Sequence, residues 1–149
     1  MCTSEQIVTE ALSWVATPYH HQACVKGVGV DCAMLLAGIA KACGLIAPDW
    51  RAPVYSPQWH LHQNEEVLTQ TLEALGCRPV PQEYQAIGDI LVLQYGRVSS
   101  HCAILVALHP PYIVHASNKE GDKRVVHHRL DAKLQARVRQ VYVFPRGTG

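Results

Sequence analysis

Apolar residues recur at helical spacing in the first half of the chain and at strand spacing in the second half. We predict a first helix that begins at a Ser4 cap, runs to about Val15 and is stopped by Pro18. The segment 19–30, which contains two glycines, is predicted to be a loop. The apolar stripe of the first helix consists of Ile7, Val8, Leu12 and Val15.

The second helix is predicted to lie at the centre of the fold. Asp31 is a suitable N-terminal cap, the apolar run 33–43 forms the helix, and Gly44 suits its C-terminal end. Lys41 is the only charge beyond the cap, so the helix is apolar almost all round, which is typical of a buried helix.

The remaining chain is predicted to change from helix to strands. An irregular stretch rich in proline and aromatic residues, 48–64, precedes a third helix over 65–75, and a short helical turn is expected at 130–136. Five segments have strand character, namely 90–94, 102–108, 112–116, 124–128 and 138–144.

This order of elements predicts the fold class. Helices followed by consecutive strands are typical of an α+β fold, in which N-terminal helices pack on an antiparallel sheet of about five strands. With 149 residues, of which 48% are hydrophobic, the chain has the length and apolar content of a single domain over 1–149.

Composition and charge exclude several classes of protein. Lys and Arg total 13 against 12 Asp and Glu, so no basic face for nucleic acid is expected. The first residues lack the pattern of a secretory signal and no apolar run could span a bilayer, so we expect cytoplasmic synthesis. The six cysteines are scattered, and we expect reduced thiols, with Cys24, Cys43, Cys77 and Cys102 acting as small hydrophobes.

Cys32 is the strongest candidate for chemistry. It follows Asp31 at the predicted helix start, where unpaired backbone N–H groups and the helix dipole stabilise an anion. Such a place lowers the pKa of a thiol from about 8.5 and makes the thiolate available as a nucleophile. The alternative is a buried structural cysteine. The sequence context favours the nucleophile.

Two histidines in strand-like sequence can serve this thiol. His101 opens one apolar strand, and His115 lies near the end of the next, after a tight connection at Pro110-Pro111. If these strands pair as a hairpin, the start of one lies opposite the end of the other, and the two imidazoles become neighbours. One could then act as a base that the other orients.

Five short motifs resemble the successive motifs of the NlpC/P60 peptidases. Each is weak alone, but their combination in this order, from about Trp14 to Ser117, is specific. The motifs are Trp14-Val15-Ala16-Thr17-Pro18-Tyr19-His20, Gly29-Val30-Asp31-Cys32, Gly88-Asp89-Ile90-Leu91, His101-Cys102-Ala103-Ile104-Leu105 and Val114-His115-Ala116-Ser117.

Further segments are similar to the phage-type cell-wall peptidases of that family. This closer resemblance implies an association with a phage or phage-like tail. The segments are Tyr19-His20-His21-Gln22-Ala23, Lys26-Gly27-Val28-Gly29, Tyr55-Ser56-Pro57-Gln58-Trp59 and Phe144-Pro145-Arg146.

The resemblance implies a papain-like α+β fold and a reaction. Family members cleave amide bonds in peptidoglycan stem peptides, typically between D-γ-glutamyl and a diamino acid, without a cofactor. By resemblance, Cys32 is the nucleophile, His101 the base and His115 the orienting residue. Tyr19 matches the motif tyrosine, whose hydroxyl can help the Cys32 backbone N–H to stabilise an oxyanion.

Four further residues are expected near the substrate. Asp31 has two possible roles, as a helix cap and as a cleft carboxylate that binds a free amine of the stem peptide. His20 and His21 follow Tyr19 directly and are expected to line the groove. Met34 stands where most family members have glycine, and we expect it to narrow or reshape the cleft wall.

Metal and nucleotide sites are not expected. The pairs His20-His21 and His127-His128 have diverging side chains, and His60 and His62 lack the ligand spacing of a zinc site. The glycines Gly27 and Gly29 lack the strand and third glycine of a nucleotide-binding loop.

Two alternative functions remain open at this point. The first is a non-catalytic tail or assembly component that keeps the fold and uses the cleft or the aromatic stretch 50–59 for protein contacts. The second is a thiol hydrolase or acyltransferase on another amide. We expect peptidoglycan stem peptides and phage-tail proteins as partners, and neither nucleic acid nor a membrane. Delivery to the cell wall in a phage-like particle would follow.

Overall fold

The structure is a computed structural model that describes residues 2–52, 65–95 and 98–145. Residues Tyr55, Ser56, Pro57, Gln58 and Trp59, and most of the predicted irregular stretch, lie outside the described part. The elements, in chain order, are α1 (Ser4–Ser13), β1 (Cys24–Val25), β2 (Gly29–Val30), α2 (Cys32–Ala42), α3 (Glu65–Ala74), β3 (Arg78–Val80), the 3-10 turn η2 (Gln82–Tyr84), β4 (Ile90–Tyr95), β5 (Val98–Leu108), β6 (Pro111–Ala116), β7 (Val125–Arg129), α4 (Ala132–Gln135) and β8 (Val138–Val143).

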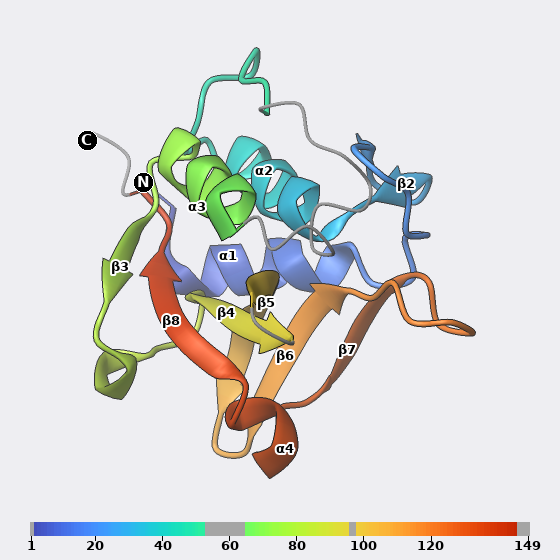
Figure 1. The fold of residues 1–149 in the computed structure, drawn as a ribbon. Coiled ribbons are helices and arrows are strands. Elements are labelled where there is room, and N and C mark those ends of the chain that lie inside the picture. The colour runs from blue at the N-terminus through green and yellow to red at the C-terminus, as the bar shows by residue number, and fades with distance from the viewer. Residues whose placement is uncertain (1, 53–64, 96–97, 146–149) are drawn as a thin grey trace.

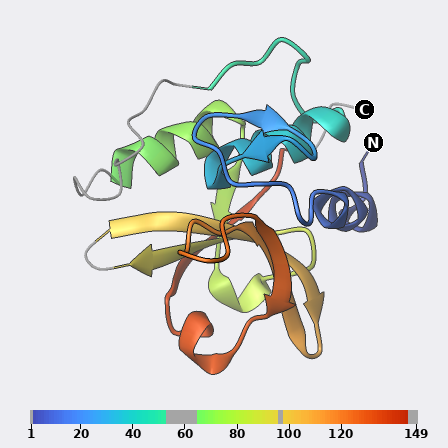
Figure 2. The same cartoon turned by 90° about the vertical axis from the view of Figure 1, so that its right-hand side faces the viewer.

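The architecture is a mixed α+β arrangement, as predicted. Six strands form an antiparallel sheet in the order β3-β8-β4-β5-β6-β7. Helices α1, α2 and α3 lie over one face of this sheet, while α4 lies on the opposite side (Figure 1 and Figure 2). No helix in the described ranges is long and apolar enough to cross a membrane.

Helix α1 differs from its prediction at both ends. Its N-terminal cap is Thr3, not Ser4, because the Thr3 and Gln6 side chains form a reciprocal capping box with the backbone. The predicted apolar stripe is also wrong in part, since Leu12 and Val15 are 37% and 40% exposed. Ile7 is buried as predicted, and the helix also buries Ala11, followed by Trp14 at its C-terminal cap.

The segment predicted as a loop before the second helix contains a short hairpin. Strands β1 and β2 pair antiparallel, with Cys24 opposite Val30. The backbone of Val30 also bridges to Tyr19. The hairpin therefore fixes the chain on both sides of the residues that enter α2.

Helix α2 is buried along its length, as its sequence predicts. Every residue from Cys32 to Ala40 is buried, and Gly44 adopts the left-handed conformation, with φ +69°, directly after the Cys43 cap. Gly38 lies where Trp14 packs against the helix. A buried helix can hold its first residue in a fixed position relative to the sheet.

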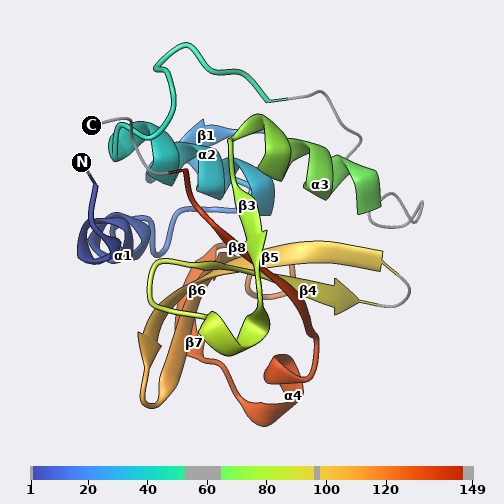
Figure 3. The same cartoon turned by 90° about the vertical axis from the view of Figure 1, so that its left-hand side faces the viewer.

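The sheet has one strand more than predicted. Strand β3 is only three residues long, contains Pro79 and pairs with β8 at the edge of the sheet (Figure 3). Proline and short length both weaken a strand signal in sequence, although both are tolerated at a sheet edge. The other five predicted strands and the helical turn before the last strand are present.

Both faces of the sheet are covered by apolar side chains. One core cluster joins the helices to the sheet residues Ile90, Val92, Cys102 and Ile104. A second cluster on the other face contains Leu91, Leu93, Ala103, Leu105 and Leu130. Strand β5 is central in this arrangement and contributes to both clusters, so its position relative to α2 is well determined.

A substitution at Gly38 tests the packing that holds α2. A Cβ at this position would lie 2.7 Å from Trp14 Cη2 and 3.2 Å from Cys24 Sγ. We expect Gly38→Ala to lower the free energy of unfolding by about 1–3 kcal/mol in urea titrations, because overpacking outweighs the higher helix propensity of alanine.

The control is the same substitution in a Trp14→Leu background. With the indole removed, Gly38→Ala should lower the free energy of unfolding by less than it does in the wild type, so the effects of the two substitutions should not be additive. A stabilising effect of Gly38→Ala in the wild-type background would contradict this account of the packing.

Candidate active site

Cys32 is placed by the start of α2. The Asp31 side chain caps the helix, accepting a hydrogen bond from the Met34 backbone N–H at 2.8 Å. The same carboxylate accepts one from the Gln22 backbone N–H at 2.7 Å. Asp31 therefore ties the incoming loop to the helix, and Cys32 takes the first helical position, as the sequence predicts.

The Cys32 thiol is almost fully buried, yet its pKa is lowered to about 6. The largest cause is a side-chain hydrogen bond from Cys102, and hydrogen bonding to His101 and the charge of that imidazole lower the pKa further. Burial and the nearby Asp31 carboxylate act in the opposite direction. The hydrogen bonds and the imidazole charge outweigh burial and the Asp31 charge, so the Cys32 thiolate is the main form near neutral pH.

Cys102 is a functional neighbour that the sequence did not indicate. Its sulfur lies 3.3 Å from the carbonyl oxygen of Cys32, which is a second acceptor within reach of the single Cys102 hydrogen beside the Cys32 sulfur. The pKa of Cys102 is raised well above its ordinary value, first by its hydrogen bond with Cys32 and then by burial. It therefore stays a protonated donor when Cys32 ionises, as well as filling the core as predicted.

His101 and His115 are neighbours, as the predicted hairpin requires. Strands β5 and β6 pair antiparallel, with Ile104 opposite Val114. His101 Nε2 lies 2.8 Å from His115 Nδ1. The pKa of His115 is lowered to about 2, mainly by burial and then by the charges of the two neighbouring imidazoles, so this ring is neutral.

Two more aromatic side chains lie against His101 and His115, and neither was predicted to be part of the site. His128 on β7 lies with its Nε2 2.8 Å from His115 Nε2. The Tyr95 ring packs edge-on against His101, with centroids 5.9 Å apart. The period of two in β7 places His127 and His128 on opposite faces, but only the strand register shows which one faces His115.

Tyr19 lies beside the thiol. Burial raises the pKa of its hydroxyl, and the charges of Cys32 and Asp31 raise it further. The phenol is therefore a hydrogen-bond donor at neutral pH. Its backbone is held by an N–H donated to the Lys123 carbonyl at 2.9 Å.

Most of these residues, but not Cys102 or Asp31, line one open cavity of about 760 Å³. The four residues predicted as catalytic all lie in its wall, and three cationic side chains stand around it. The four predicted catalytic residues are Tyr19, Cys32, His101 and His115, and the three cationic residues are Lys119, Lys133 and Arg137.

The predicted substrate-binding residues are placed differently. Among the described residues that line this cavity, none is Asp31, His20, His21 or Met34. His21 Nδ1 lies 3.8 Å from the Asp31 carboxylate, and the Met34 side chain is buried in the core. Their contacts with a substrate stay predictions.

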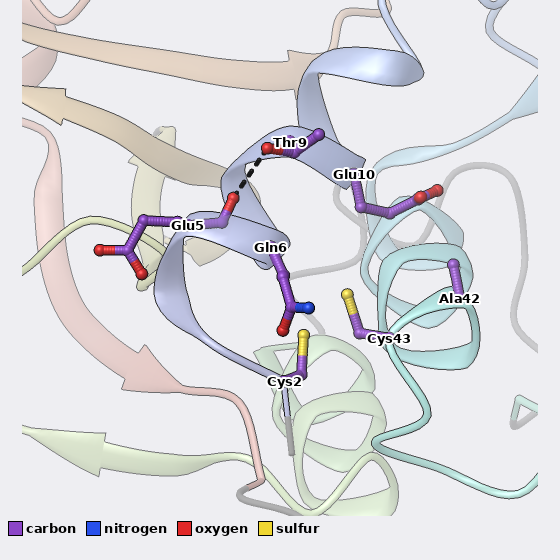
Figure 4. A pocket seen from close by; sticks show the side chains of 7 residues that line it. All are labelled: Cys2, Glu5, Gln6, Thr9, Glu10, Ala42 and Cys43. Carbon is purple, nitrogen blue, oxygen red and sulfur yellow. Dashed lines mark hydrogen bonds between the residues drawn. The ribbon is translucent and has the colours of Figure 1, made fainter.

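A second cavity, of about 500 Å³, lies between α1 and the end of α2. Figure 4 shows the side chains of Cys2 and Cys43 there, close to Gln6. Burial raises the pKa of the Cys43 thiol to about 12, and no histidine lines this wall in the described part of the chain. The cavity lacks the means to activate a thiol.

Metal ligation has no support in the described ranges, where no group of three or more His, Cys, Asp or Glu residues could hold an ion. The three imidazoles near Cys32 face one another in series instead of converging on one point. His115 and His128 each use both ring nitrogens for hydrogen bonds, and His101 uses Nε2.

Comparison with known proteins adds evidence at the level of the fold. No family model matches the chain, and a search of curated proteins finds no match. Solved structures do match. An NLP/P60 family protein similar to a lipoprotein, from Staphylococcus aureus, gives a TM-score of 0.62 at 16% identity over 97% of this chain. The chain has the NlpC/P60 fold.

Two further structures agree. The NlpC/p60 domain of the peptidoglycan hydrolase SagA gives a TM-score of 0.58 at 18% identity, covering 95% of this chain and 97% of that domain. An NlpC/P60 family protein from Bacillus cereus gives 0.61 at 16% identity, covering 97% of this chain. This chain spans only 42% and 40% of the Staphylococcus and Bacillus proteins.

The acidity of Cys32 can be measured directly. Alkylation by iodoacetamide, followed by peptide mapping, should show a Cys32 rate that rises with pH and is half-maximal near pH 6, since the thiolate reacts. Cys102→Val should move this midpoint upward by about one pH unit or more, because the ionised sulfur loses its donor.

Cys77→Val is the matched control. Cys77 is also a buried thiol, with a pKa raised to about 12 by burial, but it does not line the cavity. This variant should leave the midpoint of Cys32 unchanged. Equal shifts in both variants would mean that loss of packing, not loss of the Cys102 donor, moves the pKa.

Proposed function

We propose that the protein is a cysteine peptidase that hydrolyses an amide bond in peptidoglycan stem peptides, with an acyl-enzyme intermediate. The observation that carries this proposal is that Cys32 and His101 line the same open cavity, where the pKa of the Cys32 thiol is lowered by Cys102 first and then by His101. The similarity of the fold to the domain of a peptidoglycan hydrolase supports the choice of substrate.

In the acylation step, the Cys32 sulfur attacks the amide carbonyl carbon after its proton has passed to His101. The oxygen becomes an oxyanion, for which the Cys32 backbone N–H and the Tyr19 hydroxyl are the available donors. His101 then gives its proton to the leaving nitrogen as the C–N bond breaks. The products of this step are a thioester on Cys32 and a free amine.

In the deacylation step, His101 takes a proton from water, and the resulting hydroxide attacks the thioester. The C–S bond breaks and Cys32 leaves as the thiolate. His115 holds the imidazole of His101 in place through both steps. These roles require no cofactor, and the catalytic residues are Cys32, His101, His115 and Tyr19.

The charges around the cavity favour a substrate that carries carboxylates. Lys119, Lys133 and Arg137 line the cavity, whereas its described acidic residue, Asp122, is paired with Arg124 at 3.2 Å. Stem peptides present free carboxylates near the γ-glutamyl bond. A D-γ-glutamyl-diamino acid endopeptidase activity is consistent with this arrangement.

The biological setting is part of the same proposal. The segments similar to phage-type peptidases suggest a single-domain enzyme, synthesised in the cytoplasm and carried to the wall by a phage or prophage tail. Its partners would then be tail proteins and peptidoglycan. Nucleic acid and membranes are not proposed as partners.

Digestion of purified muropeptides tests the reaction. Wild-type protein should release fragments with a new amino terminus on the diamino acid, detected by mass spectrometry. Cys32→Ala should abolish release, and His101→Ala should lower the rate by about 100-fold or more, because both the base and the general acid are lost.

Lys133→Ala is a second test, directed at substrate charge. It should raise KM with little change in kcat if Lys133 binds a carboxylate of the substrate. Exposed Lys123, which does not line the cavity, provides the control through Lys123→Ala. Identical products from wild type and Cys32→Ala would exclude the peptidase and favour a non-catalytic tail component. Turnover only of other amides would favour another thiol hydrolase or an acyltransferase.

A further inference from the structure

His128 adds a third imidazole to the hydrogen bond between His101 and His115, and its other ring nitrogen is hydrogen-bonded to the backbone. His128 Nδ1 lies 2.9 Å from the Arg129 carbonyl oxygen, and its Nε2 lies 2.8 Å from His115 Nε2. His115 Nδ1 in turn lies 2.8 Å from His101 Nε2. We call His101, His115 and His128 the histidine series.

The carbonyl at the end determines the direction of every hydrogen bond in the series. A carbonyl oxygen only accepts, so His128 must carry a hydrogen on Nδ1, and in the neutral ring its Nε2 is then an acceptor. His115 must therefore donate from Nε2 and accept at Nδ1. His101 must donate from Nε2, which leaves the lone pair on its Nδ1.

We propose that His128 is a positioning residue that, through His115, fixes the tautomer of His101 in which Nδ1 is free to take the proton of Cys32. This role rests on the proposed thiol chemistry, since it concerns the base of that reaction. The opposite tautomer of His101 would present an N–H to the thiol and could not accept its proton.

The neutrality of the middle ring supports this direction. His115 is largely buried, and its pKa lies far below the ordinary range for histidine, so it carries one hydrogen. A reversed series would need His128 to hold hydrogens on both nitrogens, as an imidazolium beside the buried ring. Such a cation next to the cationic form of His101 would be unfavourable.

The series suits both protonation states of the site. When the proton moves, the Cys32 S–H bond breaks, an N–H bond forms at His101 Nδ1, and the charges become −1 on sulfur and +1 on the imidazole. His101 still donates from Nε2 to His115. No hydrogen bond in the series has to reverse during the reaction.

The strand register explains why this histidine, and not its neighbour, takes the role. His115 is opposite Val126 and Ile113 is opposite His128, so His128 is the diagonal neighbour of His115 on the same face of β6 and β7. His127 lies on the other face, where it packs against Tyr112 with ring centroids 5.6 Å apart. His127 is therefore a matched control on the same strand.

The test uses three variants of the full chain. His128→Leu removes the acceptor, His128→Gln keeps an acceptor oxygen near the same place, and His127→Leu is the control. Thermal unfolding of each variant reports whether the fold is kept. If His128→Leu does not fold, the tautomer of His101 in the wild type still tests the proposal, because protonation at Nδ1 in the neutral state would overturn it.

The first readout is nitrogen NMR of protein labelled with 15N-histidine, which distinguishes protonated from unprotonated ring nitrogens. The wild type, His128→Gln and His127→Leu should show His101 and His115 each protonated at Nε2. His128→Leu should show mixed tautomers. A wild type with His101 protonated at Nδ1 in the neutral state would overturn the proposal, as would an unchanged tautomer in His128→Leu.

The second readout is the alkylation rate of Cys32 at neutral pH. His128→Leu should lower it by about 10- to 100-fold, comparable with the loss of a group that holds a metal-ligating histidine. His128→Gln should recover most of the rate. Equal losses in His128→Leu and His127→Leu, or no recovery with glutamine, would contradict the positioning role.

These readouts need no cell-wall substrate, so the two proposals can fail separately. Muropeptides that stay intact while the tautomers and the Cys32 rate respond as expected would refute the proposed substrate and leave the role of His128. Muropeptide cleavage that persists with unchanged tautomers in His128→Leu would refute the role of His128 and leave the peptidase.

Discussion

The site depends on keeping a negative sulfur stable in a buried position. Removing Cys32 from water favours the neutral thiol, and the Asp31 carboxylate that caps α2 favours it as well. The hydrogen bonds from Cys102 and His101 offset both effects. The first helical position adds the positive end of the α2 dipole. The nucleophile therefore needs a helix end and a strand held together closely, and the packing of the domain provides this.

Strand β5 supplies the two groups that offset burial. Cys102 and His101 are consecutive, so in a regular strand their side chains would point to opposite faces. Cys102 faces α2 within the main core, while His101 lies at the rim of the cavity, next to an irregularity in the pairing with β4 after Leu93. A core contact and a catalytic contact thus come from one dipeptide. A shift of β5 relative to α2 would disturb both at once.

The sequence predicted the features that depend on short-range patterns. The cap and burial of α2 and the hairpin that joins His101 to His115 all follow from periodicity and turn residues. The contributions of Cys102 and His128 could not be predicted, because they depend on which residues of separate elements meet. The register of β6 and β7 selects His128, and the distance between α2 and β5 makes Cys102 a donor. Strand β3 was missed because its pairing comes from the distant β8.

A neutral third residue suits this site for an electrostatic reason. A carboxylate in the place of His115 would stabilise the His101 cation more strongly. However, it would also bring a second negative charge close to the thiolate, where the Asp31 carboxylate already raises the Cys32 pKa. A neutral imidazole orients His101 by a hydrogen bond without adding charge. Since an imidazole has two nitrogens, it needs a partner of its own to define its direction, and the Arg129 carbonyl reached through His128 is such a partner. A series of neutral imidazoles therefore has a defined direction only when its last ring is hydrogen-bonded to a group that can accept a hydrogen bond but cannot donate one.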